Sequence, residues 1–213
     1  MSGEITMPTV LSVTNHEPLV LPCNEVLRYM RCRPGDAQME ALADEGIAAV
    51  TPLLRGRACF ARFPLVMDDE AVHLGFADTE SRSLRRHLAG CDKVLVFAAT
   101  VGSDIDRLLT RLSAVSPARA VAADAAAVAA IEAWCDRLCE GWEREARTAG
   151  RETRVRFSAG YGDCPLELQI PLIAALDTPR RIGVTLTDSL LMTPTKSVTA
   201  LVGIAPSEKG EPT

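Results

Sequence analysis

The strongest constraint on the fold is a helical pattern that runs from residue 117 to residue 147. Seven positions repeat along it with heptad spacing: Val121, Asp124, Val128, Ile131, Cys135, Leu138 and Trp142. Ten alanines between residues 118 and 133 combine high helix propensity with small side chains, so neighbouring backbones can approach closely. We therefore predict one long helix that begins at Pro117.

Two acids on this helix need a partner. Asp124 occupies the otherwise apolar seam, and Glu132 flanks it four residues after Val128. Burying an unpaired carboxylate is costly, so each must be paired, hydrogen-bonded or functional. The pattern leaves open whether these acids are structural or functional.

The clearest strand is the apolar run from Lys93 to Thr100, which fits a buried, central position in a sheet. Val101-Gly102-Ser103 turns it into a helix, with Ser103 as the expected N-cap and two aspartates in the first turn. This turn contains one glycine and is neither GxGxxG nor a P-loop, so it gives little support to a phosphate site.

The remaining elements alternate between helix and strand and favour the α+β class over a regular βαβ fold. The first twenty residues predict an extended arm or edge strand, and two short strands are expected between residues 58 and 76. Further helices are predicted at 24–30 (capped by Asn24), at 37–54, at 80–89 and after Pro165, where Pro171 should kink or shorten the helix. Two more strands are predicted at 181–186 and 197–204.

A length of 213 residues suits one domain with appendages. We assign residues 1–20 to an N-terminal arm, 21–205 to the domain, and 206–213 to a disordered polar tail.

Charge and cysteine content limit the classes of function. A net charge of −5 gives no basic field to recruit nucleic acid or an anionic membrane, and no apolar run approaches the roughly 20 residues of a transmembrane helix. The N-terminus lacks the basic region of a secretory signal, and the seven cysteines are odd in number and widely spaced. We therefore expect a cytoplasmic protein with reduced thiols.

Thiol chemistry has two weak candidates. Cys135 and Cys139 are four residues apart on the long helix, but structural zinc sites need four ligands, and no CxxC motif is present. Cys164, near Arg156 and the N-terminus of the next helix, is a candidate nucleophile with a lowered pKa, although no histidine base is evident. No GxSxG elbow supports a serine hydrolase.

The segment from Arg156 to Pro165 carries the strongest functional signal. Its arginine can bind a carboxylate through two hydrogen bonds, and its Gly-Tyr-Gly turn lets a ligand approach the backbone. Tyr161 adds a flat apolar face with a hydroxyl group. These features suit a zwitterionic or nucleoside-like small molecule, and the alternative is an ordinary loop with a surface ion pair. Asp163 or Cys164 is expected to cap the next helix.

Two ordered motifs resemble a known family. Arg156-Phe-Ser-Ala-Gly160-Tyr161 is similar to the Arg-x-x-Pro-Gly-Tyr motif of the activation domain of vitamin B12-dependent methionine synthase, with Ala159 in the place of the motif proline. Downstream, the segment 182–198 resembles the second signature of that domain, Ile-Gly-x-x-Leu-Thr-Glu-Ser followed by Met-x-Pro and Ser-Val. The resemblance extends over residues 20–205.

The resemblance implies a fold and a role in methionine biosynthesis. The fold would be a curved antiparallel sheet flanked by helices. The chain would bind S-adenosylmethionine and support reductive remethylation of inactive cob(II)alamin, with an electron from flavodoxin or another reductant. Residue by residue, the ligand-binding positions would be Arg156, Ala159, Gly160 and Tyr161, with Glu132 as an acid for the ammonium or sulfonium group.

The same resemblance implies a partner. No Asp-x-His-x-x-Gly cobalamin loop is present, so the chain is expected to act as a free-standing reactivation subunit, an accessory to a methyltransferase rather than a complete enzyme. The cobalamin would be carried by a core methionine synthase or another corrinoid protein. The alternative is an interaction module that docks on such a protein without binding S-adenosylmethionine.

Overall fold

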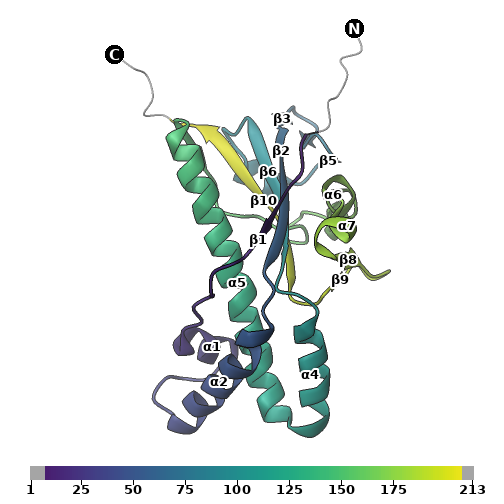
Figure 1. Cartoon of the computed structure of the whole chain (residues 1–213). Helices are drawn as coiled ribbons and strands as arrows, with labels where there is room; N and C mark the ends of the chain where they lie inside the picture. The colour runs from purple at the N-terminus through teal and green to yellow at the C-terminus, as the bar shows by residue number, and fades with distance from the viewer. Residues whose placement is uncertain (1–7, 208–213) are drawn as a thin grey trace.

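An antiparallel five-stranded sheet organises the chain, with strand order β1-β2-β6-β10-β7. The computed structural model describes residues 8–207 (Figure 1). The sheet consists of β1 (Leu11–Thr14), β2 (Arg57–Pro64), β6 (Lys93–Thr100), β10 (Ser197–Pro206) and β7 (Arg151–Thr153). The α+β class and the curved antiparallel sheet flanked by helices are confirmed.

The central strand β6 is buried on both faces, as its apolar run predicts. Its side chains alternate between two hydrophobic clusters: Leu95, Phe97 and Ala99 face one, and Val94, Val96 and Ala98 face the other. Alternation with period two is a property of any strand, so a strand covered on both sides has to be apolar at every position.

The first cluster lies between the sheet and the long helix α5 (Pro117–Thr148), as Figure 1 shows. A helix of this length spans about 48 Å and extends beyond the sheet. Beyond the sheet it packs with α1 (Cys23–Tyr29), α2 (Ala37–Val50, continued by the 3-10 turn Thr51–Leu53) and α4 (Asp104–Val115).

The second cluster lies under shorter elements on the opposite face (Figure 1). These are α3 (Arg82–His87), the 3-10 turn Leu166–Leu168, α6 (Gln169–Leu176) and α7 (Thr178–Ile182). Two small sheets complete the fold, formed by β3 (Val66–Met67), β4 (Val72–His73) and β5 (Asp78–Thr79), and by β8 (Thr185–Leu186) and β9 (Met192–Thr193).

The buried face of α5 differs from the predicted heptad seam. Trp142 is buried and packs against the rings of Phe60 and Phe97, whereas Val121 is exposed. An α-helix drifts by about 20° per heptad relative to a strict seven-residue repeat, hence by about 60° between these two positions. Near its N-terminus the helix therefore buries alanines instead of the predicted seam.

These alanines let α2 approach α5 closely. A Cβ atom built on Gly46 of α2 would lie 2.6 Å from the backbone C and O atoms of Ala122. The contact is therefore backbone against backbone, and Gly46 is the residue that permits it.

Several local predictions are wrong in informative ways. Asn24 lies inside α1, and the residue before that helix is Pro22, which makes no side-chain cap. Ser103 precedes α4 but its side chain makes no capping hydrogen bond. Of the predicted strand 181–186, only β8 is formed. Helix α7 occupies the chain up to Ile182, and Gly183 caps it in a left-handed conformation with φ of +72°.

The N-terminal prediction of an edge strand is confirmed, because within residues 8–207 β1 lies at one edge of the sheet and pairs with β2 alone. At the other end, β10 continues to Pro206, and the Ser207 amide donates to the Gly150 carbonyl. The rest of the predicted tail, residues 208–213, lies outside the described residues. No helix within residues 8–207 is both long and apolar enough to cross a membrane.

We predict opposite effects for two glycine-to-alanine substitutions in helices. Gly46→Ala forces α2 away from α5 and should lower the free energy of unfolding by about 1–3 kcal/mol. Gly141 of α5 has no atom within 4 Å of a built Cβ, so Gly141→Ala should raise it by about 1 kcal/mol. Chemical denaturation of both variants measures the difference, and equal stabilities would contradict the backbone contact.

Candidate functional site

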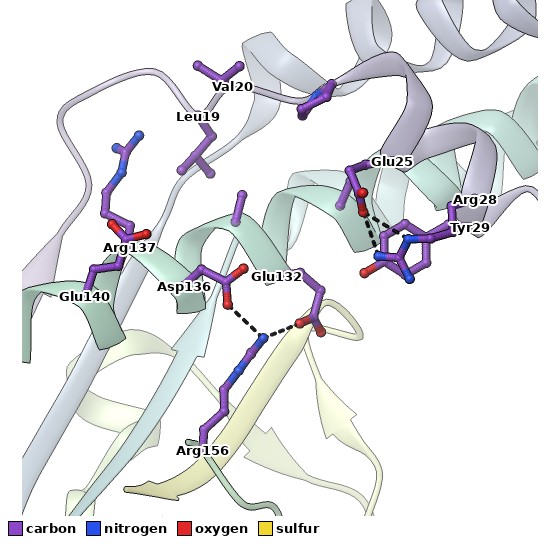
Figure 2. Close-up of a pocket in the computed structure, with 13 residues that line it drawn as sticks. Leu19, Val20, Glu25, Arg28, Tyr29, Glu132, Asp136, Arg137, Glu140 and Arg156 are labelled. Carbon is purple, nitrogen blue, oxygen red and sulfur yellow. Dashed lines mark hydrogen bonds and ion pairs between the residues drawn. The ribbon is translucent and has the colours of Figure 1, made fainter. Parts of the chain in front are cut away.

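A cavity of about 540 Å³ lies where α1 and α5 face Arg156 (Figure 2). Leu19, Val20 and Pro22, which precede α1, form a further wall. The cavity therefore joins the N-terminal part of the chain, the long helix and the loop that carries the first motif.

Arg156 is paired with two acids of α5. Its Nη2 donates to Glu132 Oε2 at 2.6 Å and to Asp136 Oδ1 at 3.0 Å (Figure 2). Burial acts to lower the pKa of the guanidinium, but the charge of Glu132 and its hydrogen bond outweigh this effect and raise the pKa. Arg156 is therefore charged at every physiological pH. Of the five predicted site residues, Arg156 and Glu132 are in direct contact.

Strand geometry explains why Arg156 faces α5. Phe157 forms a bridge with Leu201 of β10, and the Arg154 amide donates to the Gly203 carbonyl, so this segment runs beside the sheet. Consecutive side chains then point to opposite faces. Phe157 enters the second hydrophobic cluster, and Arg156 turns toward α5.

The cavity is lined by charges of both signs. Its acids are Glu25, Glu132, Asp136 and Glu140, and its guanidinium groups are Arg28, Arg137 and Arg156. A guanidinium can bind a ligand carboxylate, and a carboxylate can bind an ammonium or sulfonium group. This composition suits a zwitterionic molecule better than a simple anion.

Arg137 fixes the wall formed by the N-terminal segment. Its Nη1 donates to Asn15 Oδ1 at 2.9 Å, and its Nη2 donates to the Pro18 carbonyl at 3.0 Å. These bonds attach the stretch between β1 and α1 to α5 and so place Leu19 and Val20 at the cavity.

The other predicted site residues lie elsewhere. Ala159, Gly160 and Tyr161 form the turn after Phe157 and are not among the residues that line this cavity. Tyr161 is 71% exposed, and its ring packs edge-on against Phe157, with ring centroids 5.6 Å apart. Tyr161 thus contacts a residue of the cluster on the face opposite α5.

Asp163 caps a different helix from the one predicted. Its carboxylate accepts hydrogen bonds from the Ser81 hydroxyl and from the amides of Arg82 and Ser83, at the N-terminus of α3. The turn after Pro165 has no side-chain cap. The bond from Ser81, followed by those from Ser83 and Arg82, holds the pKa of Asp163 well below its usual range.

The acid in the predicted seam, Asp124, is paired. Lys196 Nζ lies 2.8 Å from Asp124 Oδ1, with the lysine side chain 15% exposed and the aspartate 51% exposed. The ion pair joins α5 to the start of β10, and Asp124 lies outside the Arg156 cavity.

The cysteines show no reactive or metal-binding arrangement within residues 8–207. Burial raises the pKa of Cys135 to about 12 and that of Cys139 to about 11, and it also raises the pKa of Cys164. The suggestion of a nucleophilic Cys164 with a lowered pKa is therefore wrong. In the same part of the chain, no group of three or more histidine, cysteine or acidic side chains is placed to hold a metal ion.

Sequence reasoning missed Asp136, Arg137 and the residues of α1. Asp136 carried a detectable signal, because it follows Glu132 by four positions and therefore shares its helix face. Arg137 and the α1 residues carried none, since only the tertiary fold brings them to Arg156.

Comparison with protein families identifies the chain. The model of the family described as "Vitamin B12 dependent methionine synthase, activation domain" matches residues 85–209, which is more than half of the sequence. The chain belongs to this family. The matched region includes α5, the Arg156 loop and the second motif.

Among solved structures, the chain is similar to one described as "Crystal Structure of the MetH Reactivation Domain bound to AdoHcy". The TM-score is 0.64 at 16% sequence identity, and the match covers 97% of this chain and 81% of the other. At this identity the similarity shows the fold of a reactivation domain. No curated protein matches the sequence.

We predict that Asp163→Asn lowers the melting temperature at pH 7. Because the folded pKa of Asp163 is depressed, its stabilisation is present above the unfolded value of about 4 and is lost as the pH falls below it. The difference between wild type and variant should therefore be constant from pH 7 to about pH 5 and shrink as the pH falls below about 4. Asp188→Asn is the control, since Asp188 is exposed and takes no part in the hydrogen bonds at the N-terminus of α3. Equal melting temperatures for both variants at pH 7 would refute the cap.

Proposed function

We propose that this chain is a reactivation subunit that binds S-adenosylmethionine in the Arg156 cavity and serves a cobalamin-dependent methionine synthase. The observation that carries the proposal is the contact of Arg156 with Glu132 inside a cavity of mixed charge. The family match and the AdoHcy bound to the similar reactivation domain support it.

The charged groups at the amino-acid end of the ligand suggest separate roles for Arg156 and Glu132. Arg156 would bind its carboxylate, because a guanidinium forms paired hydrogen bonds with that group. Glu132 would bind the ammonium or sulfonium group. Both hydrogen bonds from Arg156 to the α5 acids use Nη2, so Nε and Nη1 would donate to the ligand while the acids hold the side chain.

The proposal includes the turn at Ala159, Gly160 and Tyr161. Gly160 has φ of +83°, and Leu166 Cδ1 lies 3.2 Å from where its Cβ would be, so a side chain there is disfavoured. The exposed Tyr161 ring would contact the ligand or the partner.

The partner would be a core cobalamin-dependent methionine synthase or another corrinoid protein. The bound S-adenosylmethionine would supply the methyl group for its cobalamin, and flavodoxin or another reductant would supply the electron. The match to the activation-domain family supports a cobalamin-binding partner.

We predict that Arg156→Ala weakens binding of S-adenosylhomocysteine at least tenfold in titration calorimetry. A hydrogen bond to a charged group contributes about 1.5–3 kcal/mol, and the loss of that bond sets the size of the effect. Glu132→Gln should also weaken binding, since it removes the negative charge. Arg147→Ala is the matched control, because Arg147 forms an exposed ion pair with Glu143 on the same helix outside the cavity.

Absence of heat with wild-type protein would refute ligand binding. If the protein nevertheless bound a corrinoid protein, the ligand-free interaction module would replace our proposal.

We further predict that the chain restores methylcobalamin on a core methionine synthase trapped with cob(II)alamin, given S-adenosylmethionine and a reductant. The absorbance spectrum of the cobalamin follows the reaction. Arg156→Ala should abolish recovery and Arg147→Ala should not, and recovery without S-adenosylmethionine would contradict the proposed methyl donor.

A further inference from the structure

The small β3-β4-β5 sheet carries a histidine that lies between two acids. His73 is in the central strand β4, and its ring contacts Asp68 Oδ2 through Nε2 and Asp78 Oδ1 through Nδ1, each at 2.9 Å. Asp78 is the cross-strand partner of His73 on β5, and Asp68 belongs to the turn between β3 and β4. One imidazole ring therefore joins three segments of the chain.

The geometry requires His73 to be protonated. A neutral imidazole has one donor and one acceptor nitrogen, so one ring nitrogen would face a carboxylate that also accepts. Only the imidazolium donates to both acids. In agreement, the hydrogen bonds to Asp68 and then to Asp78 raise the pKa of His73 above its ordinary value of about 6.5. The bond from His73 likewise holds the pKa of Asp68 below its usual range.

Acidic groups dominate the surroundings of the ring. Residues 66–81 contain no lysine or arginine and five acids, namely Asp68, Asp69, Glu70, Asp78 and Glu80. The adjacent helix α3 contributes Arg85, whose Nη1 donates to the backbone carbonyl of Asp68 rather than to a carboxylate. The positive charge of Arg85 opposes protonation of His73, but the two acids are in direct contact with the ring. Within this segment no other basic group can replace the imidazolium.

The small sheet has few other contacts that resist opening. Each of its strands contains two residues, and sheets this small are marginally stable without packing. Val72 and Leu74 are buried in the second hydrophobic cluster and hold one face, whereas the His73 side chain is 37% exposed on the other. Exposed ion pairs contribute little to global stability, so we expect the His73 contacts to act on local opening of this sheet.

The sheet is connected to the loop that follows Tyr161. β5 leads directly into Ser81, whose hydroxyl accepts from the Leu84 amide and donates to Asp163. Asp78 and Asp163 also line the same cavity, which has a volume of about 500 Å³. A displacement of β5 would therefore act on the cap through which Asp163 holds this loop.

We propose that His73 is a pH-sensitive clamp, closed when both ring nitrogens carry protons, that controls opening of the β3-β4-β5 sheet and of the α3 N-terminus bound by Asp163. Loss of one ring proton to solvent breaks one of the two contacts with Asp68 and Asp78. Figure 1 shows β3 and β5 at the opposite end of the molecule from α1 and α2, and none of the clamp residues lines the Arg156 cavity. The inference therefore goes beyond the proposed function and does not depend on it.

The direction of the pH effect follows from the raised pKa. Because the folded state favours the protonated ring, the stabilisation is complete below the unfolded value of about 6.5 and is lost as the pH rises through the folded pKa. The clamp is thus closed in acidic solution and opens on the alkaline side of neutrality.

Nuclear magnetic resonance of the full chain without ligand, between about pH 5 and pH 9, tests the clamp. The ring signals of His73 should titrate with a midpoint above about 6.5. Amide protection from hydrogen exchange should fall through the same midpoint at Asp68 and Leu74 in the sheet and at Ser83 and Leu84 in α3. The loss should be about tenfold for each unit by which the midpoint exceeds that of the unfolded chain.

Matched variants identify the groups responsible. Asp78→Asn should lower the His73 midpoint, because it removes one of the two carboxylates in contact with the ring. Asp69→Asn is its control, since Asp69 is an exposed acid of the same turn and takes no part in the contacts of His73. His73→Gln should abolish the pH dependence of amide protection, whereas the exposed His16 can be replaced by Gln without this effect.

Two results would overturn the inference. A wild-type midpoint at or below about 6.5, or equal shifts for Asp78→Asn and Asp69→Asn, would exclude the clamp. Loss of protection at Asp68 and Leu74 with none at Ser83 and Leu84 would exclude its link to the Asp163 cap. The wild-type titration gives a result even if a variant fails to fold, and failure of S-adenosylmethionine binding would leave it unchanged.

Discussion

The contact between the alanine-rich face of α5 and its neighbours determines where the charged residues of the cavity lie. Gly46 brings the backbone of α2 against Ala122, and Trp142 packs on Phe60 and Phe97 of the sheet. Both ends of the helix are thereby fixed. Glu132 and Asp136, which lie between these two contacts, are held opposite Arg156, and α1 is held beside them.

The cavity combines this rigid support with charges that are already paired. Arg156 is partly buried and contacts two acids, which compensates its desolvation in the absence of ligand. A ligand carboxylate would share Arg156 with these acids, and a ligand cation would offset the negative charge that they bring. A zwitterion suits such a site because it adds both charges at once and leaves the net charge unchanged.

Side chains of the Arg156 motif lie on both faces of the sheet. Because side chains alternate along an extended segment, Arg156 faces α5 while Phe157 enters the opposite cluster and carries Tyr161 with it. Asp163 then ties the same loop to the N-terminus of α3. One continuous motif thus contributes to the Arg156 cavity, to the core and to a helix cap.

The sequence by itself determined the local elements with strong periodicity, namely α5 and the central strand β6, and the resemblance of its two motifs indicated the family. It also singled out Arg156 as a group that can bind a carboxylate and Glu132 as an acid that needs a partner. Only the tertiary structure decided which partners they have. Asp163 caps α3 rather than the next helix, and Arg28 and Tyr29 lie at the cavity. These contacts join residues that are far apart in the chain. Local propensity contains no information about such contacts, so only the tertiary structure could show them.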